Sequence, residues 1–492
     1  MSRSIEKKMT EAENYDQWKD AALAYDEHHR LNQWKHDEKS DLYDYKEIRR
    51  RLNKLIQFKQ ENDNHGLLFT LNEGIHGNIG GMGKGELYQQ SKFGTKQLIL
   101  DYVNEVSSAL QHLAQPRVKG VSMEEKLDFF QRASLCFGRS TLMMSGSGTF
   151  LFFHVGVLKA LWEQGLIPEI ISGSSGGSFV AAVVGTRKKE DLAEIFDPEF
   201  INLEADLRTV FNRFVARNHR QVGRKELEES VSKLIPDLTF EEAYKLSGLH
   251  INISITPAET HQRSRLLNAV TSPNVMIREA VLASCCVPGV FPPVTLAAKN
   301  VYNERVPYLP SRKWVDGSLS DDLPMKRLSR LYGVNHFIVS QTNPIVLPFI
   351  SAEKGDGGLL ATIGETSLKT IKDWGLAAGY LLQKPLHSDS YLSKLINGYI
   401  SVVSQTYTGD INILPSSRFL NLSRALAVRS NMEVYEMIQE GEKATWPEIE
   451  KIRTQTLISR ILWGIVKQLD QRVLKNSYQS DKKRRLKVVN SQ

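Results

Sequence analysis

One glycine- and serine-rich segment has the residue spacing expected around a nucleophilic serine. Residues 171–185 read ISGSSGGSFVAAVVG, and Gly173, Ser175 and Gly177 form a G-x-S-x-G pattern within them. A nucleophilic hydroxyl must stand clear of a sheet on a sharp strand-to-helix turn, and the flanking glycines let the strand and the helix approach each other. Apolar runs before and after the pattern predict that strand and that helix. We therefore expect Ser175 to be the nucleophile and the neighbouring serines to be structural.

No histidine has a suitable context to act as the base. His154 lies in a predicted helix between two apolar residues, where we expect it to be packed and hydrogen-bonded. Five histidines follow Ser175; two of them begin apolar strand-like runs and three lie in loop-like or irregular sequence: His250 and His336, then His219, His261 and His387. The usual order of serine, acid and histidine is therefore not apparent.

A carboxylate offers an alternative base. In the segment KWVDGSLSDDLP, Asp316 follows an apolar pair and precedes Gly317, which predicts a position at a strand end before a tight turn. A carboxylate there could accept the proton of the serine directly, without an imidazole between them. Asp321 and Asp322 follow in a predicted cap or turn, and we expect them to be structural.

The developing oxyanion also needs hydrogen-bond donors, and a second glycine-rich turn could supply them. In MMSGSGTFLFFHVGVLKALWEQG, a strand is expected to end at about Met144, and Gly146 and Gly148 would let backbone N–H groups converge before the next helix. The competing interpretation is dinucleotide binding, which requires a third glycine where Leu151 stands. We therefore favour an oxyanion loop.

The sequence around these motifs predicts three regions. Residues 1–135 carry apolar residues at helical spacing, which indicates a helical N-terminal domain. Residues 136–345 alternate strand-like and helix-like runs, typical of an α/β domain with a mainly parallel sheet. Residues 346–492 are expected to form a helical C-terminal extension. Within it, residues 454–474 carry one apolar face, which would pack on the protein's own body or, alternatively, lie in a lipid surface.

Composition and charge limit the classes of partner. The 492 residues include 41% hydrophobic and 24% charged residues, the balance of a globular protein with a substantial core. A net charge of +7 suits an anionic surface such as phospholipid, whereas no basic run is interleaved with aromatic residues as nucleic-acid binding would require. The basic cluster at residues 482–487 is expected to be a solvated tail, with a membrane or polyanion contact as the alternative.

Cysteine usage and hydropathy predict an intracellular protein. The three cysteines, Cys136, Cys285 and Cys286, are odd in number and include an adjacent pair, which argues against a disulfide framework. The first residues lack the apolar core of a signal peptide, and no run of about 18 apolar residues predicts a transmembrane helix. A lipid substrate would therefore be met at an interface, by peripheral association.

Taken together, these motifs resemble the patatin-like lipid acyl hydrolases, and most closely their triacylglycerol lipase branch, which has an extra N-terminal helical domain of unknown function. That family combines a glycine-rich oxyanion loop, a G-x-S-x-G elbow and a D-G-[GA] motif. The resemblance extends over most of the chain, through GTKQLILDYVNEV, FHVGVLKAL, SRLLNAVTSPNVMIREAVLASCCVPGVFPPV, WVDGSLSDDLPMKRLS, NHFIVSQTNP, YTGDINILP and GEKATWPEI.

The resemblance implies a three-layer α/β fold and a serine lipid acyl hydrolase that needs no metal or cofactor. Carried over by position, Ser175 is the nucleophile and Asp316 the base of a Ser–Asp dyad, and the oxyanion loop contains Gly146, Ser147 and Gly148. The substrate would be triacylglycerol or phospholipid at a membrane or lipid-droplet-like interface. The loop departs from the family pattern at Ser147 and at Leu151, where glycines are usual. The alternative is therefore a catalytically weakened lipid-binding or scaffold protein.

Overall fold

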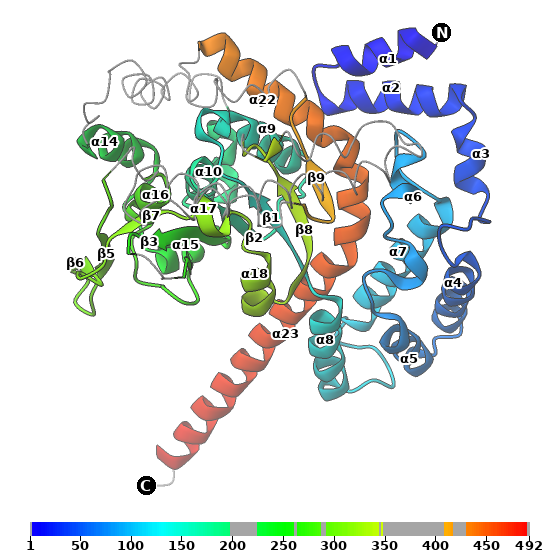
Figure 1. Cartoon of the computed structure of the whole chain (residues 1–492). Coiled ribbons are helices and arrows are strands. Elements are labelled where there is room, and N and C mark those ends of the chain that lie inside the picture. Colours follow the sequence, from blue (N-terminus) through cyan, green and yellow to red (C-terminus); the bar gives the residue numbers. More distant parts are fainter. Residues whose placement is uncertain are drawn as a thin grey trace, which may run out of the picture. The chain divides into compact units, whose positions relative to one another are not determined.

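The computed structural model describes residues 2–196, 224–259, 263–286, 292–343, 346–347, 408–416 and 430–489 (Figure 1). The chain divides into two compact units, one containing residues 1–139 and 449–492, the other residues 140–448. Within the described residues, no helix combines the length and the apolar character needed to cross a bilayer.

The first unit is helical. Its helices in the described residues are α1 (Ser2–Glu11), α2 (Tyr15–His28), α3 (Leu31–His36), α4 (Tyr45–Gln60), α5 (Asn64–Gly74), α6 (Glu86–Gln89), α7 (Gln97–Leu113), α8 (Met123–Phe137) and α23 (Ile449–Val489). Local sequence sets their ends: Ser122 and Glu125, for example, form a reciprocal capping box at the start of α8. Buried side chains of α4, α5, α7, α8 and α23 share one apolar core.

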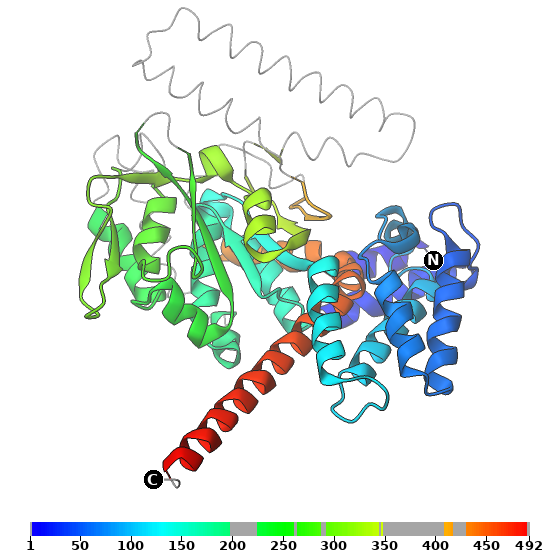
Figure 2. The same ribbon diagram turned by 90° about the horizontal axis from the view of Figure 1, so that it is seen from below.

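The expected C-terminal extension is divided between the two units. α22 (Asn431–Thr445) belongs to the second unit, whereas α23, red in Figure 2, belongs to the helical one. The physical reason is the apolar face expected over residues 454–474: Ile458, Leu462 and Leu469 are buried in the core with α7 and α8. That face therefore packs on the protein itself. The basic cluster at 482–487 lies in the last turns of α23, where the side chains are outside the described part of the chain.

The second unit is built on a mostly parallel sheet. Among the described residues the strand order is β4-β3-β2-β1-β8-β9, with β7 also paired to β3. The strands are β1 (Arg139–Met144), β2 (Ile170–Gly173), β3 (His250–Pro257), β4 (Arg265–Leu267), β7 (Trp314–Asp316), β8 (Val334–Ser340) and β9 (Ile411–Ile413). β1, β2 and β3 are parallel, as are β8 and β9, whereas β4 and β7 run antiparallel to β3. Strands β5 (Leu296–Lys299) and β6 (Arg305–Tyr308) form a separate hairpin.

Helices cover both faces of this sheet (Figures 1 and 2). The described helices are α9 (Leu151–Glu163), α10 (Gly176–Gly185), α11 (Leu192–Ile195), α14 (Arg224–Leu234), α15 (Phe240–Ser247), α16 (Ile277–Ser284), α17 (Ser318–Asp321), α18 (Met325–Tyr332) and α22. Ile170 packs with Leu328 and Tyr332 of α18, whereas Ile251, in register with Ile171, lies directly beside α10. Because neighbouring strand residues point to opposite faces, α10 and α18 lie on opposite sides. The expected α/β fold with a mainly parallel sheet is confirmed.

α22 holds α9, the helix that follows the expected oxyanion loop. The two helices approach so closely that a Cβ on Gly156 of α9 would lie 1.9 Å from the carbonyl oxygen of Ile438. Gly441 of α22 meets the carbonyl of Phe153 in the same way, at 2.2 Å. A larger residue at either position would force the helices apart, so this contact fixes the start of α9.

Candidate active site

Ser175 lies on the sharp turn between β2 and α10, as its motif predicts. Its backbone has φ 50° and ψ −124°, a conformation that side-chain-bearing residues rarely adopt. Such strain costs about 1–3 kcal/mol and persists where the surrounding structure enforces it. From Ile170 to Thr186, Ser175 is the only residue that is not buried. The turn thus presents this hydroxyl while its neighbours are packed.

The two flanking glycines permit this turn because the backbone passes close to both. A Cβ on Gly173 would lie 2.3 Å from the backbone of Gly177, and a Cβ on Gly177 would lie 2.4 Å from the carbonyl oxygen of Met144. Neither position has room for a side chain. The other candidate serines serve the structure, since Ser174 donates its hydroxyl to the carbonyl of Asp322 and Ser178 donates to the carbonyl of Ser175.

Strand pairing explains why Asp316 meets Ser175 although 141 positions separate them in the chain. β4 pairs with one edge of β3, where Arg265 of β4 lies opposite Ile255 of β3. Asp316 of β7 also pairs with Ile255, so β7 must lie on the other edge of β3. β2 pairs with that same edge as far as Ile253. β2 and β7 run toward each other along this edge and end two residues apart. The turn that carries Ser175 follows the end of β2, and Asp316 is the last residue of β7.

Asp316 is a buried carboxyl group with a raised pKa. Its side chain is 1% exposed, and burial raises its pKa from the ordinary range to about 6. Three hydrogen bonds oppose this rise by stabilising the carboxylate: one from the backbone N–H of Ser318 at 2.8 Å, one from the Ser318 side chain, and one from the Ser175 side chain. At neutral pH the carboxylate is therefore ionised and in contact with the hydroxyl of Ser175.

The expected oxyanion loop lies beside the turn, but its three residues are not equivalent. The N–H of Gly146 already donates to the Oδ1 atom of Asp322 at 2.7 Å. The N–H groups of Ser147 and Gly148 donate to no acceptor among the described residues. From Thr141 to Leu158, Gly148 is the only residue with partial exposure, and its φ of 54° suits glycine. The N–H groups of Ser147 and Gly148 are thus available to bind a ligand oxygen, whereas the N–H of Gly146 is already bonded.

Two further residues of this site were not predicted from the sequence motifs. Gly176 follows Ser175 at the first turn of α10, and its N–H has no acceptor in the described part of the chain. In G-x-S-x-G turns generally, the residue after the serine supplies a backbone N–H to the oxyanion, so Gly176 could have been predicted from the motif. Ser284 at the end of α16 accepts a hydrogen bond from the N–H of Ser175 at 2.9 Å and donates to the carbonyl of Ser254 at 2.8 Å. No sequence spacing indicates this second contact.

The three histidines that the structure describes in the second unit, His154, His250 and His336, have structural contacts. His154 is fully buried, its ring nitrogens lie within hydrogen-bond distance of Ser340, Thr342 and the carbonyl of Ser145, and burial lowers its pKa to about 4. It is therefore neutral and tied to the strand ends, as expected. His250 stacks between Tyr244 and Tyr332, and His336 bonds to Ser140; His219, His261 and His387 lie outside the described residues.

Leu151 is accommodated at the start of α9. Leu151 is 3% exposed, and a Cβ added to Gly176 would lie 3.1 Å from the Cβ of Leu151. The leucine therefore packs against the start of α10, where a glycine is the partner that leaves room for it.

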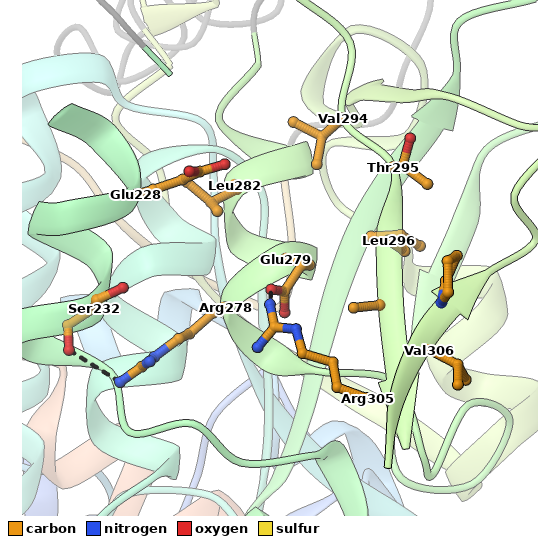
Figure 3. Close-up of a pocket in the computed structure, with 12 residues that line it drawn as sticks. Glu228, Ser232, Arg278, Glu279, Leu282, Val294, Thr295, Leu296, Arg305 and Val306 are labelled. Atoms are coloured by element: carbon orange, nitrogen blue, oxygen red, sulfur yellow. Dashed lines mark hydrogen bonds and ion pairs between the residues drawn. The ribbon is translucent and has the colours of Figure 1, made fainter. Parts of the chain in front are cut away.

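A cavity of about 570 Å³ lies between α14, α16 and the β5–β6 hairpin (Figure 3). This volume falls in the range of small-molecule sites. Arg305 of β6 forms an ion pair with Glu279 of α16 in its wall, and Leu282 and Val294 add apolar surface. Ser175 does not line this cavity. The cavity and Ser175 are connected only through α16, which lines the cavity and ends at Ser284, the residue that accepts the N–H of Ser175.

The ion pair in this cavity should affect stability. Glu279 is 8% exposed, and the Arg305→Ala variant would leave its carboxylate buried without that partner. An unpaired buried polar group costs about 1–3 kcal/mol, so we expect the free energy of unfolding in urea to fall by that amount. Adding Glu279→Gln should recover part of the loss, because an amide is cheaper to bury than a charge. An unchanged midpoint in Arg305→Ala would contradict the argument.

Comparison with known proteins agrees with this geometry. Residues 142–328 match the patatin-like phospholipase family, and residues 1–135 match a domain of unknown function (DUF3336). The chain is 31% identical to triacylglycerol lipase ptl2 of Schizosaccharomyces pombe, over 94% of the chain and 75% of that protein. It is 34% identical to triacylglycerol lipase 4 of Saccharomyces cerevisiae and 32% to triacylglycerol lipase SDP1L of Arabidopsis thaliana. Each of these two alignments includes 90% of the present chain. They include 50% of the yeast protein and 56% of the Arabidopsis protein, so the chain spans about half the length of these relatives.

The fold and the relatives together identify the class and the family of this protein. An α/β sheet with a strained serine on a strand-to-helix turn is the arrangement found in α/β hydrolases. The extensive match to ptl2 then settles the family. The chain belongs to the patatin-like phospholipase family, and is a hydrolase of the lipase and phospholipase class. The resemblance drawn from the sequence is confirmed.

Proposed function

We propose that this protein hydrolyses the acyl esters of triacylglycerol or phospholipid through a Ser175–Asp316 dyad and an acyl-enzyme. One observation carries the proposal: the strained, partly exposed Ser175 hydrogen-bonds to a buried carboxylate whose pKa is raised to about 6. A base with a pKa near the working pH is suited to accept and then return a proton.

In the first half of the reaction, Asp316 accepts the proton of Ser175 while the serine oxygen attacks the ester carbonyl carbon. The carbonyl oxygen takes on the negative charge, and the N–H groups of Ser147, Gly148 and Gly176 are the donors we assign to it. Collapse of the tetrahedral intermediate breaks the bond to the leaving alcohol. That alcohol takes the proton from Asp316, and the acyl group remains on Ser175.

The second half repeats these roles with water as the nucleophile. Asp316 accepts a proton from water, the hydroxide adds to the acyl carbonyl, and the same donors hold the oxyanion. Ser175 leaves, takes the proton back, and a fatty acid is released. An acceptor alcohol in place of water would give acyl transfer instead of hydrolysis by the same steps.

The relatives support a neutral lipid as the first substrate to test. Three of them are named triacylglycerol lipases, although the chain spans only about half the length of two of these. Triacylglycerol is insoluble, so the reaction takes place at the surface of a lipid aggregate. The net charge of +7 supports peripheral association with an anionic lipid surface.

The proposal is tested by incubating purified protein with emulsified triacylglycerol and with vesicles of neutral and of anionic phospholipid. We expect release of fatty acid, fastest from triacylglycerol, and covalent labelling of Ser175 by a fluorophosphonate probe. Preferred hydrolysis of phospholipid would keep the dyad and change the substrate. A folded protein that neither labels nor releases fatty acid would instead be a binding or scaffold protein, and the proposed function would be wrong.

A further inference from the structure

We propose that Asp322 is a positioning residue that holds the oxyanion loop in its active geometry. The inference rests on the proposed function of that loop. Asp322 follows α17, six residues after Asp316, and is 1% exposed. Nothing in its sequence context distinguishes it from the neighbouring Asp321, and its role emerges from its partners in the fold.

Each oxygen of the Asp322 carboxylate accepts a hydrogen bond from a different part of the site. Oδ1 accepts the N–H of Gly146 at 2.7 Å, and Oδ2 accepts the Nδ2 amide of Asn343 at 3.0 Å. Gly146 directly precedes Ser147, so its orientation determines where the next two N–H groups point. Asn343 lies just beyond β8 and anchors the other side of the carboxylate.

The same residue also reaches the nucleophile turn. The hydroxyl of Ser174, the residue before the nucleophile, donates to the main-chain carbonyl of Asp322 at 3.0 Å. Asp322 therefore connects the oxyanion loop and the turn that carries Ser175 directly, and only Gly317 and the four residues of α17 separate it from Asp316 in the chain. Donors contribute to catalysis only when they are aimed at the oxyanion, so a group that fixes both segments controls this aim.

Removing the carboxylate should impair the chemical step more than substrate binding. In Asp322→Ala we expect kcat on a soluble short-chain ester to fall about 10²-fold or more with KM within about twofold, as happens when oxyanion stabilisation is lost. The matched control is Asp321→Ala: its carboxylate pairs with Arg327 and is not bonded to the loop, so its kcat should stay close to wild type. A folded Asp322→Ala variant with wild-type kcat would overturn the proposal.

A reciprocal exchange tests the same bond if Asp322→Ala fails to fold. At pH 8, above the pKa of about 7 to which burial raises Asp322, Asn343→Asp places a second carboxylate against the first and should lower kcat by repulsion. Adding Asp322→Asn reverses donor and acceptor: the new amide can donate to the new carboxylate, and its oxygen can still accept the N–H of Gly146. We expect the double variant to recover at least about tenfold in kcat over Asn343→Asp, the sign of a direct coupling. No recovery in a folded double variant would refute the pairing.

Fluorophosphonate labelling separates this inference from the proposed function. If Ser175 of the wild-type protein does not label, the dyad itself is wrong. If wild type labels and Asp322→Ala labels at the same rate, the nucleophile stands and the role of Asp322 is wrong. We expect labelling of wild type and at least about tenfold slower labelling of Asp322→Ala, because the phosphonyl oxygen uses the same donors as the oxyanion.

Discussion

Replacing Ser175 by alanine is expected to abolish ester hydrolysis and fluorophosphonate labelling while the protein stays folded. The hydroxyl oxygen is the atom that would form the acyl-enzyme, and loss of such a nucleophile costs on the order of 10⁶ in kcat. Its removal leaves the turn intact, because the N–H of Ser175 and not its hydroxyl is held by Ser284. The measurement is fatty-acid release by wild type and variant at equal protein concentration.

The matched control for this experiment is Ser172→Ala. Ser172 lies on β2, three residues before the nucleophile, and its buried hydroxyl has no hydrogen-bond partner in the described residues. Its removal should therefore leave activity and stability close to wild type. Full activity in Ser175→Ala would show that another group attacks the ester, and loss of activity in Ser172→Ala would show that the region tolerates no change.

A glycine at the same position tests the strain of the turn. Ser175→Gly should be as inactive as Ser175→Ala, because both lack the hydroxyl. Glycine adopts φ of 50° without a Cβ penalty, so the glycine variant should unfold at a higher temperature than the alanine variant. Equal melting temperatures would mean that the turn is not strained.

The parts of the site that the sequence predicted are those imposed by local geometry. A serine on a tight strand-to-helix turn needs Gly173 and Gly177 because a neighbouring backbone occupies the space of each missing side chain. That requirement produces a fixed spacing in the sequence. Asp316 could be selected because a strand end followed by Gly317 is also a local pattern, although only the pairing of β2 and β7 on β3 explains why it reaches Ser175.

What the sequence could not predict depends on contacts between distant residues. Gly146 was expected to help hold the oxyanion, but its N–H is bonded to Asp322, 176 positions away. Ser284 holds the nucleophile turn from 109 positions away, and no spacing rule connects the two. The C-terminal helices likewise divide between two units according to which core accepts each apolar face, which a periodicity cannot specify.

Replacing Asp316 by asparagine is expected to lower kcat by several orders of magnitude. An amide cannot accept the serine proton, whereas its oxygen can still accept the N–H of Ser318, so the geometry should persist. The control is Asp321→Asn, which changes a neighbouring carboxyl that pairs with Arg327 and should keep most of the activity. Activity of Asp316→Asn within about tenfold of wild type would exclude the dyad.

The raised pKa of Asp316 determines the direction of the pH dependence. Only the carboxylate can act as the base, so wild-type activity should rise as the pH increases through about 6 and then level off. Such a rise resembles the titration of an imidazole, but burial lowers the pKa of His154 to about 4, so His154 cannot account for it. Burial also raises the pKa of Asp322 to about 7, so this second carboxyl of the site titrates just above Asp316. The rise through about pH 6 should persist in His154→Gln. The residual activity of Asp316→Asn should lack it and keep only the change near pH 7 that belongs to Asp322.

The same shift predicts an opposite effect on stability, which separates a catalytic carboxylate from a structural one. The folded-state pKa of Asp316, about 6, lies above the ordinary value near 4, so the folded protein binds more protons between these values, and stability is lost as the pH rises through this window. Above it, ionised Asp316 destabilises the fold by a few kcal/mol, on the order of what such a shift implies. At pH 8, Asp316→Asn should therefore melt at least as high as wild type while being inactive. A carboxylate retained for stability would give the reverse, a lower melting temperature on substitution.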